Sequence, residues 1–490
     1  MIDMKLTAAS YHNLTSYERM KMGDHSLDWT NRPNVFKSYP KASKISLPGI
    51  REFDEVKKPL FPLFEPVVHS ESKDFKMTVD DLAKILVLTQ TITAKSQGGA
   101  TEFFFRSAAS AGALYPTEIY AVSAGIAELK DGIYHYSISD HSLEIIREGR
   151  FLSIEPGEAC RAVFIFTAIF FRSSWKYRDR AYRYNLMDTG HVIENQLLAL
   201  KAMGLSHKLS YDFDDKQVNR LLGLDENLEA ALAFIDIPGK DLQLIAPALK
   251  TINPLAPSFK EASLVARIQK QYEMIAQIHS SAEQIRNPSV EIRMMDHTGL
   301  NLKAIKGTPW INERIPAAGY PEAVFLRRSK RDFADEPVDH STIAGLIASL
   351  RAENTPCICT GLLIGSANGC SPGFYLVDQT SGKPFMASDG YFNEKMADIC
   401  LHQLWLAKAS LHFIILSNLA LLDEAFGARG YRYALMSAGR MGQRIYLAAT
   451  SLGLGCCGIG AFYDHEAARL LGLDDDTRLL YLLAAGKIRK

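Results

Sequence analysis

The sequence lacks the patterns that mark small secreted domains, zinc proteins and membrane proteins. Its seven cysteines form no Cys-x-x-Cys pair and no cluster with histidines, which argues against a disulfide framework or a metal site. We therefore expect a cytoplasmic protein that binds no metal. No run of about 18 apolar residues occurs, and the first twenty residues contain no apolar signal core, so we expect no membrane segment.

An excess of charge of one sign is also missing, because Lys+Arg and Asp+Glu both number 55. This balance gives no reason to expect a nucleic acid or an anionic membrane as partner. What is present is an ordinary globular mixture in 490 residues, with 47% hydrophobic and 22% charged residues. Single cores stop growing near about 250–300 residues, so two or three domains are expected.

An internal repeat organises the chain. Residues 182–225 and 431–474 align without a gap at an offset of 249, and 18 of the 44 positions are identical. Each copy has the same predicted order: a helix, a small-residue loop, strands, a long helix opened by Tyr-Arg-Tyr, a second loop, a short helix and a final strand. This alternation predicts an α+β or α/β unit, and we expect an α+β fold with a mixed sheet flanked by helices.

The repeat sets the expected domain boundaries. We expect an N-terminal unit over 1–245, a linker over 246–310 with an amphipathic helix near 259–286, and a C-terminal unit over 311–490. Two copies of one unit can pack as an intramolecular pseudo-dimer, and such a chain would be a monomer or a higher oligomer of it. A diverged pair can lose one of its two equivalent sites and keep the other.

A strongly basic segment precedes a predicted helix of the second copy. Residues 327–333 read Arg-Arg-Ser-Lys-Arg-Asp-Phe, so four cations surround one serine. Arginine grips phosphate oxygens bidentately, and a serine hydroxyl can donate to a third oxygen. A solvated basic turn is the commoner explanation of such a run on charge alone.

The segment resembles the FMN-phosphate motif of the nitroreductase family. The positions that match are Arg327, Ser329 and Arg331. The family also places a basic pair on this phosphate near its C-terminus, and here that pair is Lys487 and Arg489. The resemblance implies that FMN is the cofactor.

Two loops extend the resemblance. The first copy carries Ser-Ala-Gly-Ala-Leu-Tyr-Pro, which is similar to the loop that crosses to the partner's flavin in the SagB-type (thiazole/oxazole-forming) dehydrogenases. The implied cofactor-binding residues there are Ser110, Gly112, Ala113, Leu114 and Tyr115. The second copy has a small-residue loop similar to the one that lines the flavin, with Ile459, Gly460 and Ala461.

A lysine-tyrosine pair precedes the long helix of the first copy. Lys176 and Tyr177 match the pair that acts in the catalytic site of SagB-type enzymes. Both side chains can move a proton when burial and neighbours poise them. Without the resemblance, a surface lysine and a core tyrosine would be the simpler interpretation.

The two copies carry complementary parts. At the positions of Gly460 and Ala461 the first copy has Tyr211 and Asp212, which would crowd a flavin, whereas the second copy has lost the lysine-tyrosine pair. We therefore expect one FMN per chain, with the phosphate grip from the second copy and the loop and catalytic pair from the first.

Three functions stay open. The first is an FMN-dependent oxidoreductase that oxidises a C–N ring, such as an azoline, in a small molecule or modified peptide. The second is an NAD(P)H-dependent nitroreductase-like reductase, and the third is a flavin-binding protein without turnover. The resemblance favours the first, and the sequence alone does not identify the substrate.

Overall fold

The computed structural model describes residues 5–23, 26–49, 53–66, 76–98, 101–156, 158–239, 253–286, 292–305, 318–351 and 356–489. The chain divides into two compact units. The C-terminal unit comprises Met1–His25, Lys58–Pro66 and Gln277–Lys490, and the N-terminal unit comprises Ser26–Lys57 and Val67–Ala276. The division is therefore not contiguous, because two N-terminal segments belong with the second half of the chain.

The N-terminal unit is built on a seven-stranded sheet with the order β1-β6-β5-β4-β7-β9-β8. Its strands are β1 (Lys44–Ser46), β4 (Thr117–Ala124), β5 (Gly132–Ser137), β6 (Ser142–Glu148), β7 (Arg161–Ile169), β8 (Lys208–Ser210) and β9 (Glu229–Ile237). A separate hairpin pairs β2 (Ile92–Gly98) with β3 (Thr101–Arg106). The helices are α2 (Val79–Thr89), α3 (Phe170–Tyr177), α4 (Ala181–Met203), α5 (Asp215–Leu222) and α7 (Pro257–Glu261).

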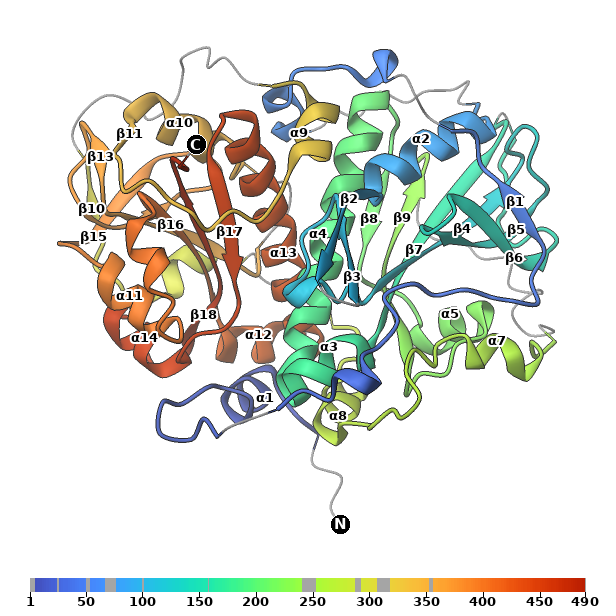
Figure 1. The fold of residues 1–490 in the computed structure, drawn as a ribbon, viewed down its shortest axis with the longest axis horizontal. Helices are drawn as coiled ribbons and strands as arrows, with labels where there is room; N and C mark the ends of the chain where they lie inside the picture. The colour runs from blue at the N-terminus through green and yellow to red at the C-terminus, as the bar shows by residue number, and fades with distance from the viewer. Residues whose placement is uncertain are drawn as a thin grey trace. The chain divides into compact units, whose positions relative to one another are not determined.

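The C-terminal unit repeats this plan with the sheet β10-β15-β14-β12-β16-β18-β17. Its strands are β10 (Lys303–Ala304), β12 (Cys359–Ile364), β14 (Gly373–Val377), β15 (Pro384–Asp389), β16 (Leu411–Asn418), β17 (Gly455–Ile459) and β18 (Thr477–Gly486), and the short β11 (Val338–Asp339) and β13 (Ala367–Asn368) pair separately. Its helices are α1 (Ala8–Leu14), α9 (Tyr320–Leu326), α10 (His340–Ala348), α11 (Asn393–Ile399), α12 (Leu419–Phe426), α13 (Arg429–Ser451) and α14 (Asp464–Leu471). Helix α13 lies beside β17 and β18 (Figure 1).

The structure confirms the repeat in detail. Helices α3 and α12, and likewise α5 and α14, begin and end 249 residues apart. Each sheet also has a bulge at the equivalent place, between Phe166 and Thr167 in one copy and between Ile415 and Leu416 in the other. A bulge needs an extra residue in one strand, so its presence in both copies shows that even this irregularity was duplicated.

The sheets differ from the expected mixed type. Within the described residues, every neighbouring pair in both seven-stranded sheets is antiparallel. Alternation of helices and strands suggested some parallel pairs, but pairing partners are decided by long-range packing. The parallel pairing that does occur between named strands joins β11 to β13.

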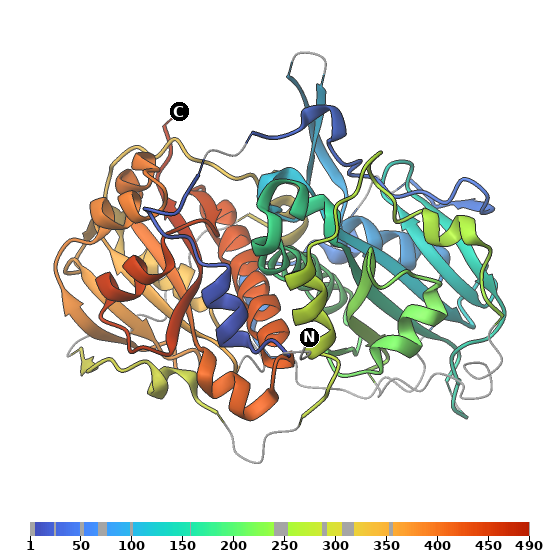
Figure 2. The ribbon, with the colours of Figure 1, turned by 90° about the horizontal axis from the view of Figure 1, so that it is seen from below.

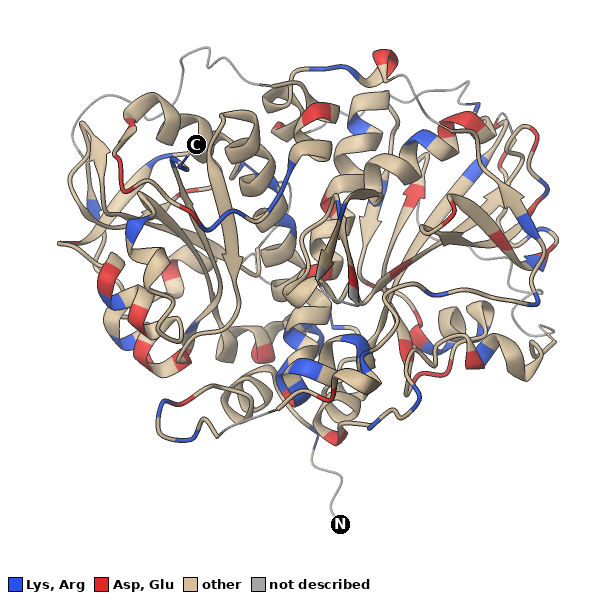
Figure 3. Ribbon diagram, in the orientation of Figure 1, with Lys and Arg blue, Asp and Glu red and all other residues tan. Residues whose placement is uncertain are grey.

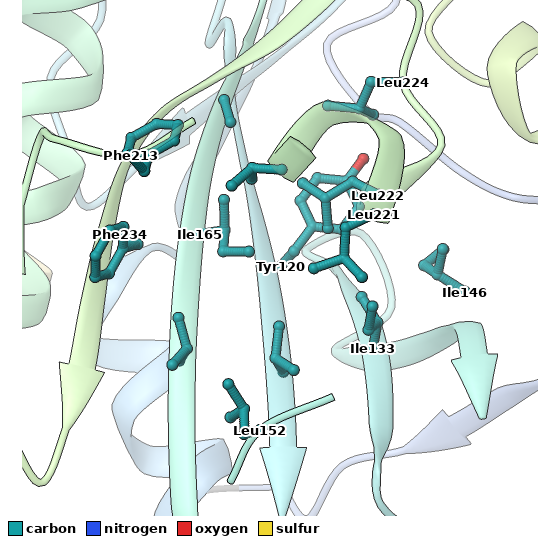
Figure 4. Packing of buried hydrophobic residues seen from close by; sticks show 14 of the residues in the cluster. Tyr120, Ile133, Ile146, Leu152, Ile165, Phe213, Leu221, Leu222, Leu224 and Phe234 are labelled. Carbon is teal, nitrogen blue, oxygen red and sulfur yellow. The ribbon is translucent and has the colours of Figure 1, made fainter. Parts of the chain in front are cut away.

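The core of the N-terminal unit lies between one face of its sheet and α5. Tyr120, Ile133 and Ile165 point from the strands toward Leu221 and Leu222 of α5 (Figure 4). Side chains alternate between the faces of a strand, so Thr117 points to the opposite face. There its hydroxyl lies 2.9 Å from that of Thr189 on α4, which places α4 against the second face.

The predicted linker helix near 259–286 is wrong, because two short helices replace it, α7 and α8 (Glu273–Ser281). Between these two helices, backbone N–H and C=O groups form hydrogen bonds with residues outside the segment. Asn31 accepts from the Ile268 N–H at 3.0 Å and donates to its carbonyl at 2.7 Å, and the Asn34 N–H donates to the Val265 carbonyl at 2.7 Å. These bonds draw the segment onto the N-terminal unit and interrupt the helical ladder. Parts of the linker, 246–252, 287–291 and 306–310, lie outside the described residues.

Helix α1 is held inside the C-terminal unit by buried polar contacts. The ring of His12 lies 3.0 Å from the Tyr431 hydroxyl and 3.2 Å from the Asp464 carboxylate, and all three side chains are buried. The carboxylate of Asp423 accepts from the first N–H groups of α1, as expected for the N-terminus of a helix. Figure 2 shows this dark blue helix beside the red helix α13.

Charges of both signs are scattered over the ribbon of each unit (Figure 3), as the balanced composition predicts. Within the described part of the chain, no helix is long and apolar enough to cross a membrane. No group of three His, Cys, Asp or Glu side chains in that part could hold a metal ion.

Candidate functional site

Three segments singled out in the second copy lie together in the C-terminal unit. The basic segment forms a bridge between Ser329 and Cys456 of β17, and the Lys330 N–H donates to the Cys456 carbonyl at 2.9 Å. The basic segment is thereby fixed along the strand that leads into the predicted flavin loop. More than a hundred residues separate the two in sequence.

The C-terminal basic residues join the other side of the same segment. The Ala334 N–H donates to the Lys487 carbonyl at 2.9 Å, and the Arg489 N–H donates to the Asp332 carbonyl at 3.0 Å. Lys487 and Arg489 are thus brought beside the predicted phosphate motif, as the sequence led us to expect. Their roles toward a ligand stay predictions.

Glycine permits this close assembly. A Cβ atom on Gly455 would lie 2.2 Å from the Cγ2 atom of Ile488, and one on Gly458 would lie 1.9 Å from the Tyr481 hydroxyl. Both distances are too short for any side chain, so the backbone of β17 packs directly on its neighbours. Ile459, the last residue of β17, is buried, and Gly460 and Ala461 beyond the strand are half-buried.

A hydrogen-bond chain gives Ser329 a preferred direction. The Gly458 N–H donates to the Tyr446 hydroxyl at 2.6 Å, and that hydroxyl lies 2.9 Å from Ser329 Oγ. Because an N–H group can only donate, Tyr446 accepts there and has its own proton to give to Ser329. Ser329, which is exposed, can then donate its proton outward, as an anion requires.

Basic side chains belong to the segment of Ser329 and to the C-terminal segment that is hydrogen-bonded to it. Arg327 is buried, and its guanidinium lies 5.3 Å from the centre of the Tyr446 ring, whereas Arg331 is exposed. Burial raises the pKa of Tyr446, so the phenol stays neutral and does not compete with an anion. Lys487 and Arg489 form only loose ion pairs, at 3.7 and 3.8 Å from carboxylate oxygens. Such surface pairs contribute little and can be exchanged for a ligand.

The predicted loop of the first copy is a strained turn in the N-terminal unit. Gly112, Ala113 and Tyr115 have positive φ values of 66°, 53° and 47°, and two of them are not glycine. The turn is held at both ends, because the Tyr115 N–H donates to Ser110 Oγ at 2.9 Å and Arg172 donates to the Tyr115 carbonyl at 2.8 Å. Leu114 packs in the small apolar cluster next to it.

The predicted catalytic pair rests on this turn. Lys176 and Tyr177 are the last residues of α3, and both are half-buried. A Cβ atom on Gly112 would lie 3.0 Å from the Tyr177 hydroxyl and 3.4 Å from Cδ of Lys176. The ammonium group of Lys176 lies 5.3 Å from the centre of the Tyr177 ring. The structure thus joins two segments of the first copy that are about 60 residues apart, and glycine at 112 is what lets them meet.

Sequence reasoning missed two residues that hold these segments in place. Tyr446 orients Ser329, and Asp188 of α4 accepts hydrogen bonds from Ser110 and Ala111 in the strained turn. The repeat contained the signal for both. The first copy has Leu197 where the second has Tyr446, and the second has serine where the first has Asp188. At each position the two copies differ, and the difference could have drawn attention to the tyrosine and to the aspartate.

The N-terminal unit also contains a buried network of charged side chains from three neighbouring strands of its sheet, β4, β5 and β6. The His135 ring lies 2.9 Å from carboxylate oxygens of both Glu118 and Glu144. Burial alone would raise the pKa of Glu118, but the Arg172 guanidinium and His135 outweigh it and lower the pKa to about 2. Burial lowers the pKa of His135, and its hydrogen bonds to Glu118 and Glu144 outweigh that effect and raise it.

Comparison with known structures shows the fold. A presumed nitroreductase of Anabaena variabilis matches with a TM-score of 0.76 and 24% identity, over 98% of this chain and 99% of its own. At that identity the likeness concerns the fold alone. The match extends over the whole length of both chains, so the double-unit plan is shared.

Three sequence relatives match parts of the chain. A presumed nitroreductase of Methanocaldococcus jannaschii is 38% identical over 19% of this chain. The trifolitoxin-processing protein TfxB of Rhizobium leguminosarum is 32% identical over 30% of this chain, and the microcin B17-processing protein McbC of Escherichia coli is 29% identical over 25%. The chain spans only 46%, 42% and 50% of these relatives' own lengths.

The nitroreductase family model matches residues 72–237 and 383–487, which is more than half of the chain and includes both copies. The trifolitoxin- and microcin B17-processing relatives agree with the resemblance to SagB-type enzymes at the level of the family branch. The chain therefore belongs to the nitroreductase family and carries the family's α+β unit twice in one polypeptide.

Proposed function

We propose that the protein is an FMN-dependent oxidoreductase with one FMN per chain. The observation that carries this proposal is the anion-directed serine of the C-terminal unit. The Ser329 hydroxyl lies 2.9 Å from that of Tyr446, which can donate to it, and backbone hydrogen bonds join its basic segment to the C-terminal one. A phosphate monoester, with nearly two negative charges and three acceptor oxygens, suits such a site.

The proposal gives each group of residues a role. Arg327, Ser329 and Arg331 hold the phosphate, and the terminal pair of Lys487 and Arg489 adds charge. In the C-terminal unit, the half-buried Gly460 and Ala461 would line the ring, because small residues allow close approach to a flat surface. The turn at 110–115 keeps the cofactor-binding role that the resemblance implies. Bound FMN supplies the two-electron redox chemistry, and the protein supplies position and proton transfer.

We assign proton transfer to Lys176 and Tyr177. Oxidation of an azoline to an azole removes one hydride and one proton from the ring, and FMN, when bound, would supply the hydride acceptor. A neutral lysine or an ionised tyrosine can take the proton, and half-burial beside each other gives these side chains a shared environment in which a proton can pass. The relatives TfxB and McbC are named as trifolitoxin- and microcin B17-processing proteins, and this supports a modified peptide as the substrate class proposed here.

A reductase that uses NAD(P)H is the second candidate. The relative from Methanocaldococcus jannaschii, which is 38% identical over 92 residues, favours it. The two candidates differ in the direction of electron flow. Rapid bleaching of the bound flavin by NADPH without oxygen would favour the reductase, whereas bleaching only by an azoline-containing peptide would favour the dehydrogenase.

The decisive experiment is an absorbance spectrum of the purified protein, with identification of the released cofactor. We expect a flavin spectrum and one FMN per chain. Arg327→Ala should remove the flavin, whereas Lys176→Ala should keep it and lose turnover. A colourless protein, or two flavins per chain, would contradict the proposal. Full turnover in the Lys176 variant would instead point to a flavin-binding protein in which this pair has no catalytic role.

A further inference from the structure

A buried carboxylate lies directly beneath the strained turn of the N-terminal unit. Asp188 is only 5% exposed, and Ser110 Oγ donates to it at 2.6 Å. The Ala111 N–H donates to both of its oxygens at 3.1 Å. These contacts come from the first two residues of the turn, and the carboxylate itself sits in the middle of the long helix α4.

We propose that Asp188 is a positioning residue, whose charged carboxylate holds the turn at 110–115 against Lys176 and Tyr177 and releases it when protonated. This inference rests on the function proposed for the lysine-tyrosine pair. It adds a control of that site by pH.

The geometry explains why an acceptor is needed at this place. Ser110 Oγ accepts from the Tyr115 N–H at 2.9 Å while its own proton goes to Asp188. One side chain therefore connects α4 to both ends of the turn. The turn includes three residues with positive φ, a conformation that persists only when the surroundings enforce it.

The second copy supports the assignment. It carries Ser437 at the position of Asp188, and it has also lost the lysine-tyrosine pair and the intact turn. An acid on this helix would be of no use there. Its presence in only one copy ties it to the parts that only that copy retains.

The charge state of Asp188 is set by its burial. Burial raises the pKa of Asp188 to about 7, and the hydrogen bonds from Ser110 and Ala111 oppose the rise only in part. Other groups that can carry charge flank the turn or α4, namely Lys176 and Tyr177 at the end of α3, Arg172 on α3, Arg106 at the end of β3, Tyr184 and His191 on α4, and Asp80, Asp81 and Lys84 on the neighbouring α2.

Protonation changes what the carboxyl can accept. A carboxylate accepts at both oxygens, whereas the acid keeps one accepting oxygen and turns the other into a donor, so the Ser110 hydroxyl and the Ala111 N–H must share one acceptor. We expect the turn to loosen as the pH falls through about 7. As the turn loosens, Gly112 should lose its contact with Lys176 and Tyr177, and turnover should fall.

The test compares Asp188→Asn with the wild type in two readouts. The amide is neutral at every pH, so the variant should mimic the acid form. Backbone amide exchange of residues 110–115, corrected for the intrinsic pH effect, should be about tenfold faster at pH 6 than at pH 8 in the wild type, as expected for loss of a charge-assisted hydrogen bond. In the variant it should be fast at both values.

The second readout is the pH profile of turnover. The wild type should show an ionisation near pH 7 that Asp188→Asn lacks, while Asp80→Asn on the exposed face of α2 should keep the wild-type profile. Asp188→Glu should retain the ionisation, which covers the case in which the asparagine variant folds poorly. Equal exchange at both pH values in the wild type overturns the inference, even if the flavin and the activity prove correct. If flavin or turnover is absent, the proposed function fails. Amide exchange alone still decides whether Asp188 holds the turn at 110–115 in a pH-dependent way.

Discussion

Replacing Tyr446 by phenylalanine tests whether the C-terminal unit orients a serine toward an anion. The change removes only one oxygen atom from a buried ring, but that oxygen accepts from Gly458 and lies 2.9 Å from Ser329 Oγ. Without it, the serine hydroxyl loses its donor and can turn inward. We expect weaker binding of FMN but little change for riboflavin, which lacks the phosphate.

The magnitude follows from the hydrogen bonds concerned. A charge-assisted bond from Ser329 to phosphate contributes about 1.5–3 kcal/mol, so Ser329→Ala should weaken FMN binding at least tenfold. Tyr446→Phe loses only the orientation of that bond, worth about 0.5–1.5 kcal/mol or a factor of about 2–12. The bare Gly458 N–H should cost a further ~1 kcal/mol in the free energy of unfolding.

A double-mutant cycle makes the reasoning refutable. Titration calorimetry of the flavin-free protein would give the affinities for FMN and riboflavin in the two single variants and the double variant. In the double variant no hydroxyl remains to be oriented, so Tyr446→Phe should add nothing to Ser329→Ala. Additive losses, or an equal loss of riboflavin affinity, would show that Tyr446 acts on the fold and not on the serine.

Three further predictions concern stability. Gly458→Ala should lower the free energy of unfolding by about 1–3 kcal/mol because its Cβ would lie 1.9 Å from the Tyr481 hydroxyl; thermal melting should show this, while Gly23→Ala, which meets nothing within 4 Å, should melt like the wild type. Because the pKa of His135 is raised in the folded protein, its ion pairs stabilise the fold at pH values below about 6.5. This stabilisation is lost as the pH rises through the pKa of the folded state, so the stability difference between wild type and His135→Gln should shrink from pH 5 to pH 9. A difference that stays constant over this range would refute the prediction. The carboxyl pKa of Asp188 is also raised, from 3.8 to about 7, so ionising this buried group costs stability. The cost grows between these pH values and reaches about 4 kcal/mol at pH 8. Denaturant melts should show the wild type losing stability with pH faster than Asp188→Asn, and parallel curves would contradict the assignment.

Much of the fold could be predicted because the internal repeat allows equivalent positions of the two copies to be compared. The offset of 249 residues marks equivalent positions, and the pairs α3 with α12 and α5 with α14 keep it without error. The grouping of Arg327, Ser329 and Lys487 around one place could be anticipated from the family motif. It is realised through backbone bonds that no sequence pattern specifies.

The remaining features depend on contacts between distant segments. The strand pairing in the sheets, the break between α7 and α8, and the orientation of Ser329 each depend on partners far away in sequence. Asp188 looks like one more polar residue in a helix until the turn at Ser110 is seen above it. Local propensity carries no information about such tertiary partners, so these features emerge only from the structure.

The position of helix α1 bears on how the polypeptide folds as it is synthesised. His12 leaves the ribosome more than 400 residues before Tyr431 and Asp464, which it contacts in the finished protein. The intervening segment 26–57 has by then joined the other unit. Domains generally fold in order of synthesis, so the opening segment must wait while the unit after it forms. A clone that begins at residue 246 would leave the buried Asp464 without its histidine, and co-expression of residues 1–66 as a separate chain is the remedy that the contacts suggest.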